Sequence, residues 1–335
     1  MSAKYSRIIS TGSALPAARI TNEDLARRLA ADGIETSDEW IRTRTGIEAR
    51  RFVNGTTETT TTLAAAAAQK ALEGGGVDPK TIDLIIVATT TPDQVFPSTA
   101  AAVQRLIGAA GCAAGCAAFD VQAVCAGFIY ALNAADAMLR AGPYQRALVI
   151  GAETMSRVID MKDRATCVLF GDGAGAVVLE ASAKPGILAA RMYADGSYDE
   201  NVLGLTARID HGELCGRPYI NMDGRQVFKL AVDGLTSSAQ EVAVLAGVDP
   251  QDVDVYIPHQ ANLRIMTMVA KKLGIPDERM IKTVSEQGNT SAASVPLALD
   301  EAVRSGKISD GSLVLLQAVG AGMAWGSAIV RWRSE

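Results

Sequence analysis

The sequence contains no long hydrophobic run. Its apolar stretches, among them residues 84–88 and 313–316, have the length of strands and fall far short of the roughly 20 residues that a membrane-spanning helix needs. The first residues, MSAKYSRIISTG, include no apolar segment of signal-peptide length. We therefore expect a cytoplasmic protein that does not enter a membrane.

The chain also lacks blocks of like charge. It has 32 basic and 37 acidic residues, for a net charge of −5, and the two signs are mixed throughout. Proteins that bind nucleic acids or membrane surfaces usually carry extended basic segments or patches. The charge pattern thus gives no support to either kind of partner.

Histidine and cysteine are scarce. His211 and His259 are the only histidines, and five cysteines are an odd number in a chain without signs of export, so we expect no disulfide framework. Cys112 and Cys116 form a C-x3-C in the Gly/Ala-rich segment 108–118, but no second ligand pair follows at the spacing of a zinc site. We interpret these two cysteines as structural or incidental and expect no metal.

The length and composition of the chain are those of a large globular protein. It has 335 residues, 48% of them hydrophobic, with 31 glycines, which is typical of an α/β protein with about two domain-sized units. The Lys184-Pro185 pair lies in a polar segment that best fits a boundary. We therefore predict two units, residues 1–183 and 184–335.

The chain is organised around residues 117–132, AAFDVQAVCAGFIYAL, with Cys125 at the centre. Residues 119–124 have the pattern of a short strand, and from Ala126 the apolar residues follow helical spacing until Gly142. A cysteine at such a transition lies at a helix N-terminus, where the helix dipole favours the nucleophilic thiolate. A lone cysteine is more often a small buried apolar residue, so the assignment depends on its partners.

The second half of the chain repeats motifs of the first half in the same order. GVDPKTID (76–83) and GVDPQDVD (247–254) are 171 residues apart, and each precedes an apolar strand. Glycine-rich segments, GDGAGAVVL (171–179) and GAGMAWGSAIV (320–330), precede the final strand of each half. The first is not a dinucleotide-binding loop, because it runs into a strand and not a helix, so we expect close backbone packing there. These matches indicate a duplicated βαβ-type unit around a central cleft.

His259 and Asn289 are the candidate partners of Cys125. His259 ends a predicted strand, where open α/β sheets gather functional groups, and Asn289 precedes a helix equivalent to the one after Cys125. Alone, Asn289 would be interpreted as a turn or N-cap residue. The three side chains fit a thioester-forming hydrolase or an acyltransferase equally well.

In these segments the chain resembles the β-ketoacyl-acyl-carrier-protein synthase III family, condensing enzymes of type II fatty-acid synthesis with the thiolase fold. The resemblance covers nearly the whole chain and rests on a combination of motifs: TSDEWI (36–41), RTRTGI (42–47), FDVQAVCAGFIYAL (119–132), LFGDGAGAVVL (169–179), IPHQANLRI (257–265), EQGNTSAASVPLAL (286–299) and GAGMAWGSA (320–328).

The resemblance implies a duplicated, five-layered αβαβα architecture and a ping-pong reaction without a cofactor. Cys125 would take an acyl group from acyl-CoA, most simply acetyl-CoA. Malonyl-acyl-carrier protein would then lose CO2, with His259 and Asn289 stabilising the enolate, and attack the acyl thioester. The backbone N–H groups of Cys125 and Ala321 match the oxyanion hole for acyl transfer. Relatives are homodimers.

The resemblance also implies binding residues for both substrates. Those for coenzyme A are Thr36, Trp40, Arg44, Arg164, Gly224, Phe228 and Asn262, with Trp40 and Arg164 on either side of the adenine. Those for the acidic carrier protein are Lys229, Arg264, Lys271 and Lys272. Phe96 and Val319 match the acyl pocket, Phe96 in that of the partner subunit.

Val319 departs from the family, in which many members carry phenylalanine, so a larger primer than acetyl is an alternative. Two other functions stay open at this point: a related condensing enzyme of secondary metabolism with a different primer or acceptor, and an acyl-CoA thioester hydrolase.

Overall fold

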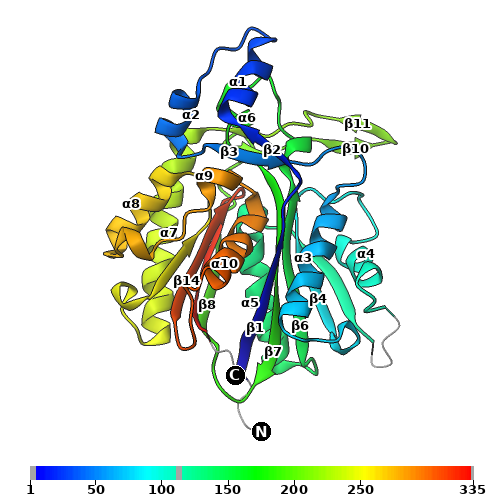
Figure 1. Cartoon of the computed structure of the whole chain (residues 1–335), viewed down its shortest axis with the longest axis vertical. Coiled ribbons are helices and arrows are strands. Elements are labelled where there is room, and N and C mark those ends of the chain that lie inside the picture. The colour runs from blue at the N-terminus through cyan, green and yellow to red at the C-terminus, as the bar shows by residue number, and fades with distance from the viewer. Residues whose placement is uncertain (1–4, 111–114, 333–335) are drawn as a thin grey trace.

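Two β-sheets flank a pair of central helices in the computed structural model, which describes residues 5–110 and 115–332 (Figure 1). The first sheet has the order β1 (Tyr5–Ala14), β7 (Asp172–Ser182), β6 (Arg146–Thr154), β4 (Leu84–Ala88), β5 (Ala117–Val121). The second has the order β13 (Val255–Pro258), β14 (Leu313–Gly320), β15 (Ala324–Arg331), β8 (Ile187–Ala194).

The pairing pattern of the two sheets confirms that the halves are alike. In the first sheet β1–β7 and β7–β6 are antiparallel, and β6–β4 and β4–β5 are parallel. In the second sheet β8–β15 and β15–β14 are antiparallel and β14–β13 is parallel. A parallel bridge between Tyr256 and Met280 stands where β5 stands in the first sheet. The repeat also keeps its spacing, since β4 begins at Leu84 and β13 at Val255.

Helices complete five layers of αβαβα (Figure 1). The outer layers hold α3 (Thr60–Gly74) with α4 (Thr99–Leu106) on the first sheet, and α7 (Gly224–Ala246) with α8 (Leu263–Leu273) on the second. The central layer holds α5 (Gly127–Ala141) and α10 (Ser294–Arg304), which contact both sheets. Both central helices bury mainly apolar side chains against the sheets, which stabilises the joint between the halves. Asp136 of α5 and Asp300 of α10 are exceptions, since each accepts hydrogen bonds from hydroxyl groups of β1.

The remaining elements gather at one end of the molecule, uppermost in Figure 1. They are α1 (Asn22–Ala30), α2 (Asp38–Thr45), α6 (Arg164–Cys167), α9 (Val284–Gln287), and the pairs β2 (Ala18–Thr21) with β3 (Ala49–Phe52), β9 (Leu203–Gly204) with β12 (Asn221–Met222) and β10 (Arg208–Asp210) with β11 (Glu213–Cys215). Thr21 and Asp24 form a capping box at the start of α1, and this local signature can be read from the sequence. The sequence did not predict the short strand pairs, because segments of two to four residues carry no periodicity.

Glycines let the first sheet approach the central layer closely. A Cβ on Gly151 of β6 would lie 2.2 Å from the carbonyl oxygen of Ala292, and one on Gly175 of β7 would lie 2.6 Å from the nitrogen of Leu297. This confirms the close backbone packing predicted for segment 171–179. The segment is not a turn before a strand, however, since β7 already begins at Asp172.

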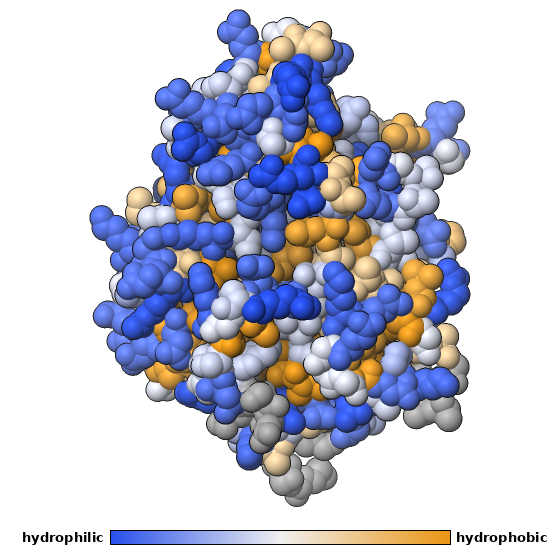
Figure 2. Space-filling model, viewed as in Figure 1, coloured by the Kyte–Doolittle hydropathy of each residue, from blue (hydrophilic) through white to orange (hydrophobic). Residues whose placement is uncertain are grey.

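The outer surface is largely hydrophilic on the face shown in Figure 2. In the described part of the chain, none of the helices combines the length and the apolar character needed to cross a membrane.

Candidate active site

A cavity of about 730 Å³ lies where the two halves meet. Cys125, His259 and Asn289 all line it, although they are far apart in the sequence. Their exposed fractions are 5%, 3% and 7%. The structure therefore brings the three predicted side chains together at the end of one chamber.

Cys125 lies in a short 3-10 turn, η2 (Val124–Ala126), directly before α5. Val124 has a φ of 48°, and this left-handed conformation changes the direction of the chain between β5 and the helix. Gly320 at the end of β14 packs against this turn, since a Cβ there would lie 2.7 Å from the Cys125 nitrogen. The next residue, Ala321, also lines the cavity. Ala321 therefore follows directly on the residue that packs against Cys125, and the oxyanion hole of these two N–H groups stays a prediction.

Burial, however, outweighs the helix terminus in the electrostatics of Cys125. Burial raises the pKa of the thiol to about 12, a hydrogen bond from Ser291 partly opposes this, and the charge of Glu153 raises it further. The sequence suggested a thiolate favoured by the helix dipole. Without a substrate the thiol is neutral instead, because the desolvation of a buried sulfur costs more free energy than the helix N-terminus contributes.

His259 follows β13 and is fixed by Ser294 at the start of α10. Its Nδ1 is 2.6 Å from the Ser294 hydroxyl oxygen, which also accepts a 3.4 Å contact from the Gln260 N–H. Nδ1 is the one acceptor that the Ser294 hydroxyl contacts among the described residues, so the hydroxyl donates to Nδ1, and Nε2 carries the ring proton. Burial lowers the pKa of His259 to about 3, so the ring is a neutral N–H donor at ordinary pH.

Asn289 is oriented by its own loop. Its backbone N–H donates to Leu169 and its carbonyl accepts from Gly171, which ties the loop to the segment before β7. Its side-chain oxygen accepts from the Ser291 N–H at 2.9 Å. Since the oxygen is engaged, the amide NH2 is the group left for the cavity. His259 and Asn289 are therefore two neutral hydrogen-bond donors next to a thiol.

Three of the residues predicted for coenzyme A, Gly224, Phe228 and Asn262, line the cavity. Gly224 is the first residue of α7, and Asn262 is the N-cap of α8. The Asn262 amide also donates to the carbonyl of Arg44 at 3.2 Å, which joins α8 to α2.

The other four coenzyme A residues lie outside the cavity lining, around α2. The guanidinium groups of Arg44 and Arg164 lie 4.6 Å and 4.5 Å from the Trp40 ring centre. Arg164 thus stacks directly on Trp40, and a base could enter between them only if the guanidinium moved by about the thickness of a ring. The Thr36 hydroxyl is buried and has no hydrogen-bond partner among the described residues.

The two acyl-pocket residues have different positions. Val319 is buried in the cavity wall, whereas Phe96 is 82% exposed and stands clear of the cavity of its own chain. The residues predicted to meet the carrier protein are all exposed on α7 and α8. Arg264 lies over the Phe228 ring at the cavity mouth, and Lys272 pairs with Asp233.

Three buried polar residues of the site were missed by sequence reasoning: Glu153, Ser291 and Ser294. Glu153 stands out in retrospect as a carboxylate at the end of an apolar strand, and the two serines as polar residues entering an apolar helix. No spacing rule connects them to Cys125 or His259, because their proximity arises only when the halves pack together.

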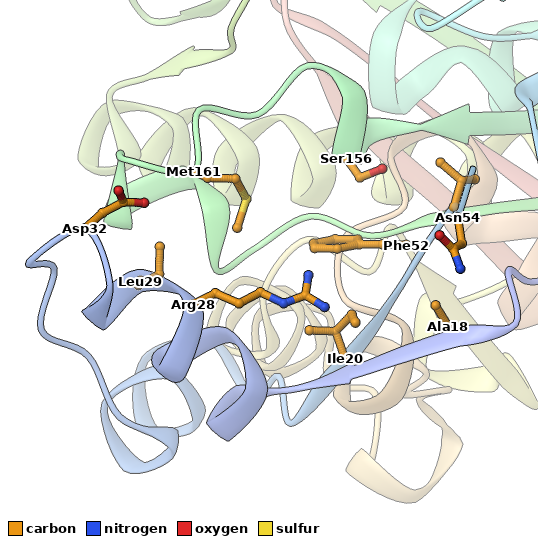
Figure 3. A pocket seen from close by; sticks show the side chains of 10 residues that line it. Ala18, Ile20, Arg28, Leu29, Asp32, Phe52, Asn54, Ser156 and Met161 are labelled. Carbon is orange, nitrogen blue, oxygen red and sulfur yellow. The ribbon is translucent and has the colours of Figure 1, made fainter. Parts of the chain in front are cut away.

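Other features of the chain take no part in this site. Figure 3 shows a second hollow, of about 500 Å³, under α1, with Arg28 reaching toward Ile20 and Phe52 and with none of the predicted catalytic side chains. Within the described ranges, no group of three or more His, Cys, Asp or Glu side chains is placed to hold a metal ion. Of the C-x3-C pair, the Cys116 thiol contacts the carbonyl of Ala117 at 3.8 Å, and Cys112 lies outside the described residues.

Comparison with known proteins gives consistent matches. Residues 119–196 match the model of the 3-oxoacyl-[acyl-carrier-protein] synthase III family, and residues 244–332 match its C-terminal model. The chain is 47% identical to the 3-oxoacyl-[acyl-carrier-protein] synthase III of Aquifex aeolicus VF5, with a TM-score of 0.89 over 98% of this chain and 100% of that one.

Two further solved structures are similar over nearly their whole length. The synthase III of Pseudomonas aeruginosa PAO1 is 37% identical, with a TM-score of 0.89 over 98% of each chain. The priming β-ketosynthase of the R1128 polyketide biosynthetic pathway is 36% identical, with a TM-score of 0.91 over 98% of this chain and 96% of that one. The chain therefore belongs to the 3-oxoacyl-[acyl-carrier-protein] synthase III family of condensing acyltransferases, with the thiolase-like fold.

Proposed function

We propose that the protein catalyses a decarboxylating Claisen condensation. It would join an acyl-CoA primer, most simply acetyl-CoA, to malonyl-acyl-carrier protein and give 3-oxoacyl-acyl-carrier protein, CO2 and CoA, which initiates fatty-acid synthesis. The observation that carries this proposal is the convergence of Cys125, His259 and Asn289 in one cavity. Substrates of this kind, an acyl-CoA and a carrier protein, agree with the family.

In the first half-reaction the Cys125 sulfur attacks the thioester carbonyl of the primer. A bond forms between sulfur and the acyl carbon, the bond to CoA breaks, and the proton that Cys125 gives up leaves with CoA as its thiol. The backbone N–H groups of Cys125 and Ala321 would stabilise the oxyanion. Such donors act strongly in a chamber from which most water is excluded. The acyl chain would rest against Val319.

In the second half-reaction malonyl-acyl-carrier protein loses CO2. The negative charge moves to the thioester oxygen, where the Nε2–H of His259 and the amide NH2 of Asn289 donate. One donor aimed at such an oxyanion contributes about 3–4 kcal/mol to transition-state stabilisation. A neutral histidine suits this task, because its N–H can donate to the oxygen directly, with no counter-ion to release first.

The proposed binding roles agree with where the predicted residues lie. Thr36, Trp40, Arg44 and Arg164 would hold the nucleotide end of CoA, and Thr36 has a free buried hydroxyl for it. Gly224, Phe228 and Asn262 would line the pantetheine path. Lys229, Arg264, Lys271 and Lys272 would meet the acidic carrier protein. We also propose a cytoplasmic homodimer, with Phe96 in the acyl pocket of the partner, and a reaction without a cofactor.

A second candidate is the priming of a secondary-metabolism pathway with a larger acyl group. Two observations favour it: the similarity to a priming ketosynthase of polyketide biosynthesis, and the small Val319 in the pocket wall. The two candidates differ in the primer and the acceptor but share the chemistry of Cys125.

A condensation assay distinguishes these functions. Purified protein receives malonyl-acyl-carrier protein and acyl-CoAs of increasing length, and products are identified by mass. We expect 3-oxoacyl-acyl-carrier protein and, without the malonyl substrate, a stable acyl-enzyme that Cys125→Ala abolishes. Free acid released from acyl-CoA alone would instead identify a hydrolase, and failure of acetyl-CoA beside a longer primer would favour the second candidate.

A further inference from the structure

Glu153 is a fully buried carboxylate to which the reaction described above assigns no role. It lies next to the last residue of β6 and does not line the cavity. Its oxygens accept hydrogen bonds from the segment after β4 and from the second half of the chain. The donors are the hydroxyl groups of Thr89, Thr90 and Thr91, the Thr90 backbone N–H, and the Ser291 hydroxyl, which lies 3.1 Å from Oε1. One carboxylate therefore joins the two halves.

Ser291 has a backbone conformation that residues other than glycine rarely adopt. It starts the turn η6 (Ser291–Ala293), the counterpart of η2 in the second half, and its φ is 49°. At such a φ the Cβ comes too close to the following carbonyl oxygen, so a residue with a side chain is strained there and glycine is not. A strained residue of this kind persists only where its surroundings hold it.

The backbone conformation of Ser291 decides where its N–H points. That N–H donates to the side-chain oxygen of Asn289, two residues earlier, at 2.9 Å. A turn of this type forms only when the residues between donor and acceptor keep their dihedral angles. With a negative φ at Ser291 the N–H would point elsewhere. The Asn289 oxygen would then lose its donor, and the amide would be free to rotate.

Strand β6 supports η6 at two neighbouring points. Gly151 leaves room for the carbonyl oxygen of Ala292, which lies 2.2 Å from where a Cβ of this glycine would be. Two residues further along the strand, Glu153 accepts the Ser291 hydroxyl. The Thr290 hydroxyl has no partner among the described residues. In the described part of the chain, the Ser291–Glu153 bond is thus the one side-chain hydrogen bond that ties residues 290–293 to the first half.

We propose that Glu153 is a positioning residue for malonyl decarboxylation. Its hydrogen bond holds Ser291 in the left-handed conformation, and Ser291 thereby directs its N–H to Asn289. Asn289 then keeps its amide NH2 toward the cavity, where the enolate oxygen forms. Glu153 touches no substrate. This inference rests on the proposed function for the step it serves, although the three residues are already connected without a substrate.

The first test compares Ser291→Ala with Ser291→Gly. Both substitutions delete the hydroxyl, so an effect of that hydroxyl on Cys125 is the same in both variants. Glycine keeps a positive φ without strain, whereas alanine does not. We therefore expect Ser291→Ala to release CO2 from malonyl-acyl-carrier protein about 5- to 30-fold more slowly than Ser291→Gly, the factor expected from the strain of one left-handed residue. The rate of Cys125 acylation by acyl-CoA should be equal in both variants.

The second test is hydrogen exchange of the backbone N–H at position 291, measured without substrate by mass spectrometry at single-residue resolution. Rates are corrected for the intrinsic rate of each residue type. Glu153→Met fills the same space but offers no oxygen to Ser291, so its exchange at position 291 should be at least fivefold faster than in the wild type. Adding Ser291→Gly to Glu153→Met should restore slow exchange, because glycine needs no support in this conformation.

His211 provides the matched control, because its φ is also 49° but it lies in the exposed hairpin of β10 and β11. His211→Ala and His211→Gly should both keep wild-type CO2 release and wild-type exchange at position 291. Equal CO2 release in Ser291→Ala and Ser291→Gly overturns the proposal, and so does unchanged exchange in Glu153→Met. Should Glu153→Met not fold, the two Ser291 variants decide.

The two readouts separate this inference from the proposed function. Hydrogen exchange requires neither acyl-CoA nor malonyl-acyl-carrier protein, so it reports on the connection from Glu153 to Asn289 alone. A protein with the expected exchange rates that releases no CO2 would keep this connection and lose the proposed reaction. A protein that condenses normally, but in which Glu153→Met exchanges as slowly as the wild type, would keep the reaction and lose the positioning role.

Discussion

Replacing Ser294 with alanine tests how the site controls the tautomer of His259. The substitution removes a buried hydroxyl 2.6 Å from Nδ1 and leaves that nitrogen without a partner. A buried polar atom that loses its partner costs about 1–3 kcal/mol. The ring can recover part of this by moving its proton to Nδ1, but Nε2 then presents a lone pair, not an N–H, to the enolate.

We therefore expect Ser294→Ala to slow malonyl decarboxylation roughly 5- to 150-fold, the range that corresponds to about 1–3 kcal/mol in the barrier. Acylation of Cys125 should be unchanged, because His259 has no part in it. Ser305→Ala, at the other end of α10, also deletes one serine hydroxyl, which bonds to Ala302, and should leave both half-reactions unchanged.

The assay combines CO2 release from malonyl-acyl-carrier protein with 15N NMR of histidine-labelled protein. The chain has only two histidines, so the spectrum shows His259 beside the exposed His211. In the wild type the His259 signals should report a protonated Nε2 that does not change down to about pH 4. An Nδ1–H tautomer in the wild type, or an unchanged decarboxylation rate in Ser294→Ala, would refute the reasoning.

Three further predictions concern other parts of the site. Trp40→Ala should raise KM for acyl-CoA about tenfold, as loss of a stacking surface predicts, and should leave KM for malonyl-acyl-carrier protein nearly unchanged; equal effects on both would contradict the adenine site. Folding lowers the pKa of His259 from 6.5 to about 3, so between these pH values the unfolded chain binds a proton and the folded chain does not. The free energy of unfolding therefore decreases as the pH falls from 6.5 toward 3. Between pH 6.5 and 4.5 the wild type should lose about 2–3 kcal/mol more than His259→Gln in urea unfolding, and parallel losses would show that the ring is protonated in the fold. Val319→Phe should reduce kcat/KM for long primers at least tenfold relative to acetyl-CoA, whereas an unaltered primer profile would place the acyl chain elsewhere.

Much of the fold could be predicted because the two halves of the chain carry the same motifs in the same order. The repeated GVDP motifs mark where β4 and β13 begin, since Asp78 and Asp249 each cap the short turn before the strand. The strand-to-helix transition at Cys125 is equally local, because apolar spacing changes from strand to helix within a few residues. Local rules of this kind need no tertiary information.

The scarcity of histidine and cysteine likewise limited the number of residues that could form the active site. The sequence pointed to His259 because it ends a predicted strand, and the repeat placed Asn289 before a helix equivalent to the one after Cys125. The structure places His211 in an exposed hairpin. Cys125, His259 and Asn289 were thus predictable as a group. Their identity follows from residue type and position along the chain.

The electrostatic state of the site depended on the tertiary structure alone. A helix N-terminus suggests a reactive thiolate, yet packing of η2 against β14 and η6 buries Cys125 and makes the thiol neutral. Glu153, Ser291 and Ser294 come near Cys125 and His259 only because the two halves meet face to face. The sequence by itself determined which groups are the candidates for the reaction, whereas the packing of the halves decided their protonation, since burial and hydrogen-bond partners are set by residues distant in the chain.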